Sequence, residues 1–326
     1  MTSRSTLSRR GLLAVLSSLA LPLRAQLSWP AKPVHIIVAY PAGGVSDVIA
    51  RLLGEKLAAQ LGQPVLVENR AGASGTIGMD AVAKAAPDGY TLGFSAISPL
   101  ALSPHLGKLP YDAQKDILPV VSVMYSPVLL LATPATSAKD FGQLLADARA
   151  RPEEVRWATS GPASLGNIVL EQLQAAANVR FTHVPYKVGG QQITDALGGQ
   201  FEVLSVNPAP SLMQHVKGGR LRALAVGAPT RLESLSNVPT LGELGYPDAN
   251  LTSVFGIFAP SGLPRAVLER LNAEINKALA LPDVRSRLLG SENVPTGGSA
   301  RDFSREIVAE SETNARIIKA SGIKGD

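Results

Sequence analysis

Short apolar runs alternate with amphipathic segments over the first hundred residues of the chain. The runs at 34–40, 65–68 and 91–95 are rich in β-branched residues and short, which predicts strands. Between them, apolar positions recur with helical spacing over 48–61 and 76–86. Regular alternation of strand and helix predicts a parallel sheet with helices on both faces.

Two longer apolar segments, 117–132 and 251–260, interrupt this rhythm. They flank a second series of strands and helices, and the tail from Pro264 is mostly helical. We therefore expect an α/β fold of two domains, 26–127 with 253–326 and an inserted 128–252, joined by two chain crossings. Within the insertion we expect helices at 137–150, 164–177, 190–198 and 210–217, and strands at 155–160, 181–184, 201–206 and 221–226.

The first 25 residues have the pattern of a secretory signal peptide. Arg4, Arg9 and Arg10 precede an apolar run that is too short to span a bilayer, and Ala25 offers a small residue for cleavage. The stretch "SRRGLL" is also compatible with a twin-arginine export signal, and both interpretations stay open. No cysteine follows the run, so lipid anchoring at a cysteine is excluded.

Removal of this segment changes the charge of the chain. The net charge of +5 includes four arginines of residues 1–25, which hold no acid, so the mature chain carries about +1. Nucleic acids and anionic membranes are therefore not expected as partners. The chain has no cysteine, and its four histidines are far apart, so we expect neither a disulfide nor a metal site.

The loop after the first predicted strand, "YPAGGVSD", is a candidate anion site. Gly43 and Gly44 would let a ligand approach the backbone at the positive end of the following helix. The lysine of a P-loop and the G-x-G-x-x-G spacing are both missing, which argues against a nucleotide. Asp47 would cap the helix and would disfavour a polyanion.

Three later loops also follow predicted strands. The first, "TSGPASLGN", offers Ser160, Ser164 and Asn167, the second contains Gly189 and Gly190, and the third, "SVNPAP", contains Asn207. Ligands of open α/β sheets lie outside the carboxyl ends of the strands. Several such loops in two domains favour a binding site in the cleft between the domains.

Signals for catalysis are weak. Ser74 in "GASGT" lacks the second glycine of a nucleophile elbow, and Asp112 and Asp116 are expected to be turn and cap residues. Arg70 and Lys187 are each interpreted as members of a surface ion pair. The alternative is that either side chain provides a positive charge that binds the ligand. We therefore expect no enzyme.

Six blocks carry a resemblance to a known family: "YPAGGVSDVIARLL", "VLVENRAGASGTIGMDAVAKAAPDGYTLGF", "LPYDAQKDILPV", "HVPYKVGG", "GGQFEVL" and "GGRLRALAV". Together they resemble the Bug (TctC-type) periplasmic solute-binding proteins of tripartite tricarboxylate transporters. The resemblance covers the mature chain and implies a type II periplasmic-binding-protein fold, without cofactor or metal. It also implies a small carboxylate ligand (a di- or tricarboxylate, an amino acid or an aromatic acid) in the interdomain cleft.

The resemblance also implies the residues that would bind the ligand. Ala163 and Asn167 stand where the family usually has glycine and histidine, and "SVNPAP" departs from a common Asp-Asn, so the ligand's identity stays open. The implied binding residues are Pro41, Ala42, Gly43, Gly44, Asp47, Ser95, Ser98, Ser160, Gly161, Ser164, Asn167 and Asn207.

The main hypothesis is thus a monomeric periplasmic receptor that closes on a carboxylate and delivers it to membrane transporter subunits. One alternative is a ligand sensor that signals to a membrane kinase. A remote alternative is an exported serine hydrolase that uses Ser160 or Ser164, for which the sequence offers no convincing base. A cytosolic regulator is not expected, because no helix-turn-helix segment is seen.

Overall fold

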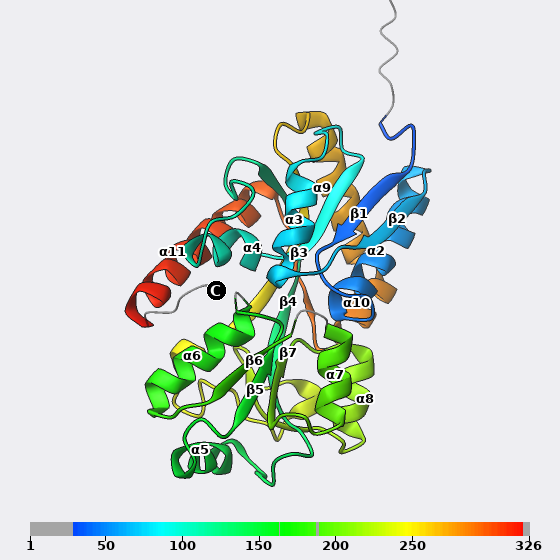
Figure 1. Cartoon of the computed structure of the whole chain (residues 1–326). Helices are drawn as coiled ribbons and strands as arrows, with labels where there is room; N and C mark the ends of the chain where they lie inside the picture. The colour runs from blue at the N-terminus through cyan, green and yellow to red at the C-terminus, as the bar shows by residue number, and fades with distance from the viewer. Residues whose placement is uncertain (1–28, 163, 187–188, 322–326) are drawn as a thin grey trace, which may run out of the picture.

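The computed structural model describes residues 29–162, 164–186 and 189–321. Its strands follow the order β2-β1-β3-β9-β4-β7-β5-β6, and β8 and β10 both pair with β4. Figure 1 shows two lobes, with β4 running between them. The expected α/β architecture of two lobes joined by crossing strands is confirmed. The signal-peptide prediction lies outside the described residues.

The first lobe begins with three parallel strands. β1 (Val34–Val38) pairs with β2 (Val65–Asn69) on one side and with β3 (Thr91–Ala96) on the other. The connecting helices are α2 (Val45–Leu61) and α3 (Thr76–Ala83). Gly62 ends α2 in the left-handed conformation that glycine adopts without strain.

Two long antiparallel strands cross between the lobes. β4 (Ile117–Ala132) pairs with β9 (Thr252–Pro260) over its first part, as far as Pro127. Its last residues, Val128–Ala132, pair instead with strands of the second lobe. The apolar segment 117–132 is thus one strand that runs from one lobe into the other, as predicted. The exact domain boundaries at 127/128 and 252/253 stay a prediction.

The second lobe repeats the layering of the first. β5 pairs in parallel with β6 and β7, while β7 and β8 run antiparallel to β4. The strands are β5 (Arg156–Thr159), β6 (Thr182–Pro185), β7 (Val203–Val206) and β8 (Arg222–Gly227). The helices are α5 (Phe141–Ala150), α6 (Leu165–Ala177), α7 (Gly189–Leu197) and α8 (Pro210–Lys217).

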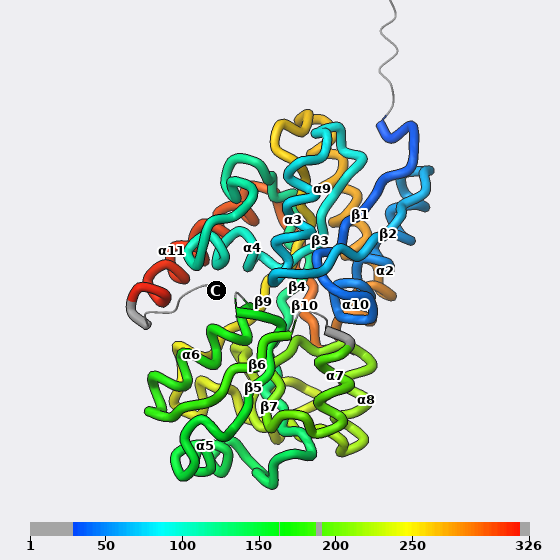
Figure 2. Tube along the Cα trace, in the orientation of Figure 1, coloured from blue at the N-terminus to red at the C-terminus, as the bar shows by residue number. Residues whose placement is uncertain are grey.

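The C-terminal helices return to the first lobe and then reach the second. α9 (Arg265–Ala280) packs against α2 and β4, and α10 (Pro282–Leu289) leads to β10 (Val294–Pro295), which pairs with β4. α11 (Ala300–Ser321) packs on β4 and also meets α6 (Figure 2). There Ile318 joins Leu102 and Ile168 in an apolar cluster that spans both lobes.

Several short elements were not predicted. They are the 3-10 turns η2 (Ala73–Gly75), η3 (Ser103–His105), η4 (Glu233–Leu235) and η5 (Pro247–Ala249), and the one-turn helix α4 (Ser98–Ala101). Two of them, η2 and α4, contribute residues to the cavity described below.

Candidate functional site

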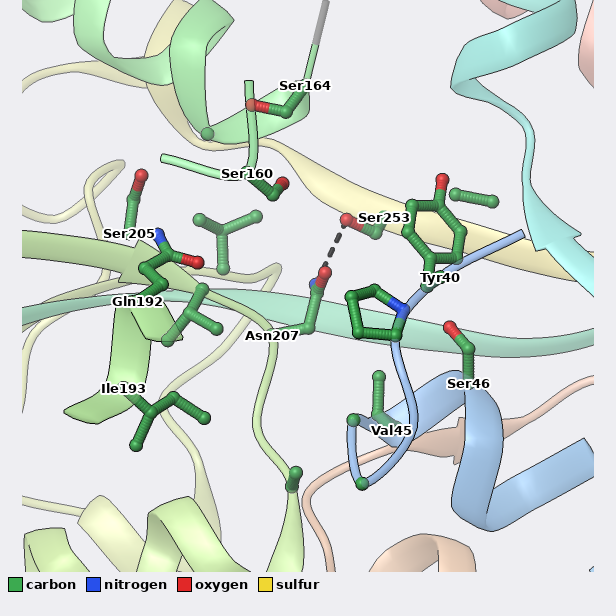
Figure 3. Close-up of a pocket in the computed structure, with 18 of the residues that line it drawn as sticks. Tyr40, Val45, Ser46, Ser160, Ser164, Gln192, Ile193, Ser205, Asn207 and Ser253 are labelled. Carbon is green, nitrogen blue, oxygen red and sulfur yellow. Dashed lines mark hydrogen bonds between the residues drawn. The ribbon is translucent and has the colours of Figure 1, made fainter. Parts of the chain in front are cut away.

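A cavity of about 410 Å³ lies between the two lobes. The loop at the start of α2 forms one wall, and the starts of α6 and α8 with one face of α7 form the opposite wall. Residues of the crossing strands, such as Val128, Ser253 and Phe255, close it between these walls. Figure 3 shows the opposed walls, with Val45 and Ser46 on one side and Gln192 and Ile193 on the other.

The first wall is the loop Pro41–Gly44, which joins β1 to α2. Gly43 has φ +82°, a conformation that favours glycine, while Gly44 is extended and is the N-cap residue of α2. Gly44 has no side chain with which to cap this helix. The first N–H groups of a helix have no partner within it, and the helix dipole makes this end positive. The start of α2, where Val45 and Ser46 line the cavity, therefore offers backbone donors there.

Asp47 supports this loop from behind. It is the third residue of α2, so the prediction that it caps the helix is wrong: the N-cap position belongs to Gly44. Its Oδ2 accepts from the Gly43 N–H at 2.9 Å, and its Oδ1 pairs with Arg51 at 2.9 Å. Burial acts to raise the pKa of Asp47, but the Gly43 N–H and Arg51 outweigh it, and the net shift is downward. The carboxylate thus holds the glycine turn in place.

The second wall begins at α6, which has a side-chain cap. The Ser164 Oγ accepts from the Asn167 N–H at 3.3 Å and donates to the Gly161 carbonyl at 2.6 Å. The Asn167 Nδ2 donates to the Pro162 carbonyl at 2.8 Å, within the same loop. These contacts engage the Ser164 hydroxyl in capping, a role different from that of a nucleophile held by a base.

One contact links the two walls directly. The Ser74 Oγ of η2 donates to the Ser160 carbonyl of the second lobe at 3.4 Å. Gly161, at φ +121°, lies so close to η2 that a Cβ there would come within 2.7 Å of the Ser74 Oγ. A side chain at this position would require the Ser74 hydroxyl to turn away and would also be strained at this φ.

Asn207 links the cavity to the crossing strands. Its Nδ2 donates to the Ser126 and Pro127 carbonyls of β4 at 3.3 and 2.9 Å, and to the Ser253 Oγ of β9 at 3.0 Å. Figure 3 shows the amide in the middle of the site. One wall residue thus holds both crossing strands at the point where they pass between the lobes.

The described part of the cavity wall carries little charge. It contains no aspartate, glutamate, lysine or arginine among the residues that the structure describes. Burial, together with the nearby Arg220 charge, lowers the pKa of His215, and burial raises that of Tyr40 to about 12, so both side chains are neutral at pH 7. The polar wall residues instead include hydroxyls and amides, among them Ser98, Ser160, Ser205, Ser211, Gln192 and Asn207.

Comparison with known proteins places this geometry in a family. The family described as "Tripartite tricarboxylate transporter family receptor", TctC, matches residues 49–323. The chain belongs to this family. It is 35% identical to protein BugT of Bordetella pertussis over 96% of each chain.

Two solved structures of similar proteins contain a bound dicarboxylate. Rpa4515 of R. palustris, solved with adipate, is 30% identical with a TM-score of 0.87, and covers 91% of this chain and 100% of its own. MatC of Rhodopseudomonas palustris, solved with malate, is 28% identical with a TM-score of 0.83, over 89% and 100%. The periplasmic binding protein BugD is 26% identical with a TM-score of 0.86, over 91% of this chain and 100% of its own, so this TctC-family chain has the fold of periplasmic binding proteins.

The structure brings most of the predicted binding residues of this TctC-family receptor to one cavity. Eight line it: Pro41, Ala42, Gly43, Gly44, Ser98, Ser160, Ser164 and Asn207. Asp47 and Asn167 are buried behind the two loops, and Ser95 is fully buried within β3. Gly161 lies in the second loop against Ser74. Wall residues that were not predicted to bind the ligand include Tyr40, Ser74, Gln192, Ile193, Ser253 and Phe255.

The remaining predictions concern residues outside the cavity. Arg70 pairs with Glu68 at 2.8 Å on the surface, and Asp112 and Asp116 accept backbone N–H groups in a turn, as expected. Lys187 and Ala163 lie outside the described residues. Within the described ranges of the chain, no cluster of side chains could hold a metal, and no helix is long and apolar enough to cross a membrane.

Proposed function

We propose that this receptor captures a small organic carboxylate between its two lobes, in the periplasm, and delivers it to the membrane subunits of a tripartite tricarboxylate-type transporter. The observation that carries the proposal is the uncapped start of α2, with Gly43 and Gly44 open to the cavity. Backbone N–H groups at a helix start bind a carboxylate without a charged side chain. The adipate and malate in two similar receptors support the same ligand class.

The wall chemistry supports this ligand class. A carboxylate at α2 would meet donors of the first lobe, while hydroxyls and amides of the second lobe would complete its hydrogen bonds, directly or through water. Apolar residues such as Val45, Val128, Ile193 and Phe255 would cover a carbon skeleton. A sugar is disfavoured because its hydroxyl groups would lie against these apolar surfaces. An organic cation is disfavoured because it would lie at the positive end of α2.

Binding would be coupled to closure of the lobes. The crossing strands β4 and β9 join the lobes, and a ligand that contacts both walls favours the closed state by its additional contacts there. We place the hinge at Asn207, whose amide joins both strands. Residues 1–25 would direct export, and the receptor would act as a monomer.

Isothermal titration calorimetry and thermal unfolding with a ligand panel test the proposal. Adipate, malate, citrate, benzoate and glutamate represent the carboxylates, and glucose and putrescine represent uncharged and cationic solutes. We expect at least one carboxylate to bind with micromolar or tighter affinity and to raise the melting temperature. The proposal is wrong if glucose or putrescine binds and no carboxylate does.

A further inference from the structure

Gln192 of α7 is a buried polar residue that the fold itself does not explain. It is 1% exposed, lines the cavity, and its Nε2 meets no hydrogen-bond acceptor among the described residues. Figure 3 shows its amide on the same wall as Ser205 and Ile193, opposite Val45 and Ser46. Buried amide groups are almost always paired in folded proteins, so this one requires an explanation.

The pattern of α7 shows that Gln192 occupies an apolar position. Ile193, Ala196 and Leu197 lie on the inner face of the helix, and Gln192 lies on the same face. Its neighbour Gln191 is exposed. A leucine at 192 would suit such a face, whereas a buried amide without its partners costs free energy. The position of Gln192 therefore indicates that its amide is present for binding, at a cost in the stability of the fold.

The chemistry of the amide limits what it can bind. Nε2 is a donor only, so its missing partner is an oxygen acceptor. Nε2 is buried, and Figure 3 shows Oε1 on the side of the cavity. The terminal torsion of glutamine is broad and nearly two-fold, so a half-turn that exchanges Nε2 and Oε1 would bring the N–H groups to the cavity. The amide is neutral, so it binds an oxygen without adding a charge to the wall.

We infer that Gln192 binds a second oxygen-bearing group of the ligand, at the wall opposite the α2 start. This inference rests on the proposed function, which assigns the first carboxylate to α2. The ligand class is then a carboxylate whose carbon chain carries another carboxylate, carbonyl or hydroxyl oxygen. Gln192 is the residue that distinguishes such a ligand from a simple fatty acid of the same length.

Adipate and hexanoate form a matched pair of probes, because they share a six-carbon chain and differ by one carboxylate. Both are titrated into the wild type, Gln192→Leu, and the control Gln191→Leu on the exposed side of the same helix. We expect the wild type to prefer adipate by at least tenfold, since a hydrogen bond to a charged group contributes about that much. Gln192→Leu should lose this preference and keep its hexanoate affinity, and Gln191→Leu should behave like the wild type.

The melting temperature of the ligand-free protein gives a second readout. Because Gln192→Leu removes an unpaired buried amide, its melting temperature should equal or exceed that of the wild type. A lower melting temperature would indicate a structural role and overturn the inference, as would an unchanged adipate preference or an equal loss of both acids. If the wild type binds neither these acids nor any other carboxylate of the panel, the proposed function itself fails.

Discussion

The two lobes present the same local arrangement, a strand followed by a loop and a helix, but they complete it differently. In the second lobe, Ser164 caps α6 with its own hydroxyl. In the first lobe, Gly44 occupies the N-cap position of α2 and has no side chain with which to cap the helix. Both helix starts lie in the wall of the same cavity.

This difference assigns unequal roles to the two walls. A serine cap uses one of the first N–H groups of α6, so that end has less to offer an anion. The N–H groups at the start of α2 are left without a cap, and Asp47 holds the loop in place by accepting from Gly43, which lies outside the helix. The first lobe is thus suited to the charged end of a ligand, and the second to its uncharged oxygens.

The substitution Gly44→Asp tests the comparison most directly, because it gives α2 an ionised cap. Gly44 has φ −75°, which aspartate adopts without strain. The new carboxylate would take the donors and repel the ligand. We expect carboxylate affinity to fall about 100-fold, about 3 kcal/mol, while the free energy of unfolding stays equal or rises.

Calorimetry and urea unfolding measure these two quantities, and Gly44→Ala is the control. A Cβ at Gly44 would lie 3.6 Å from the Pro41 carbonyl oxygen, an ordinary contact, so alanine should keep the affinity within about threefold. Wild-type affinity in Gly44→Asp would show that the anion does not bind at α2.

Asn207→Asp tests whether the Asn207 amide holds the second wall to the crossing strands β4 and β9. The isosteric aspartate keeps the shape but has no N–H to donate to Ser126, Pro127 and Ser253, and it faces two carbonyl oxygens. We expect unfolding free energy to fall by about 2–3 kcal/mol in urea titrations. Ser253→Ala, which removes one acceptor, should cost less than half of this. Equal losses in the two variants would contradict the role of Asn207 as the link between the strands.

The sequence predicted the regular elements because their determinants are local. The apolar segment 117–132 matches β4 at both ends, since this strand is buried over most of its length. α5 begins at Phe141, four residues later than predicted, because Asp140 caps it by accepting from the Gln143 N–H. The turn η2, in which Ser74 has φ +53°, and the two-residue strand β10 were missed, because contacts with distant segments create them.

The candidate site was predictable only in its loops. Ser160, Ser164 and Asn207 were predicted because they are polar and follow predicted strands. Which other residues form the wall depends on which faces of the two lobes meet in the folded protein. Ser253 of β9 and Tyr40 carry no local signal of this kind. Gln192 did have a local signal, because it is a glutamine on the apolar face of a predicted helix. Periodicity alone, however, does not show which of Gln191 and Gln192 lies on that face.

Ser164→Ala examines the capped side of the comparison. The variant removes the hydroxyl that accepts from the Asn167 N–H and donates to the Gly161 carbonyl, so the free energy of unfolding should fall by about 1 kcal/mol in urea titrations, although the Ser164 backbone carbonyl still accepts from this N–H at 3.0 Å. Carboxylate affinity should change less than fivefold, because the charged end binds at α2. A loss of affinity as large as that of Gly44→Asp would mean that the walls share the anion equally.

The pH dependence of stability gives the smallest expected effect and concerns Asp47. Its pKa is lower in the folded protein than in the unfolded chain, so the ionised carboxylate stabilises the fold. This contribution is fully present above the unfolded value of about 3.9 and is lost as the pH falls through the folded value. Wild type should therefore exceed Asp47→Asn by about 1 kcal/mol at pH 6, with the difference shrinking below pH ~4 in urea titrations. A difference that is constant down to pH ~3 would show that the charge of Asp47 beside Arg51 does not cause it.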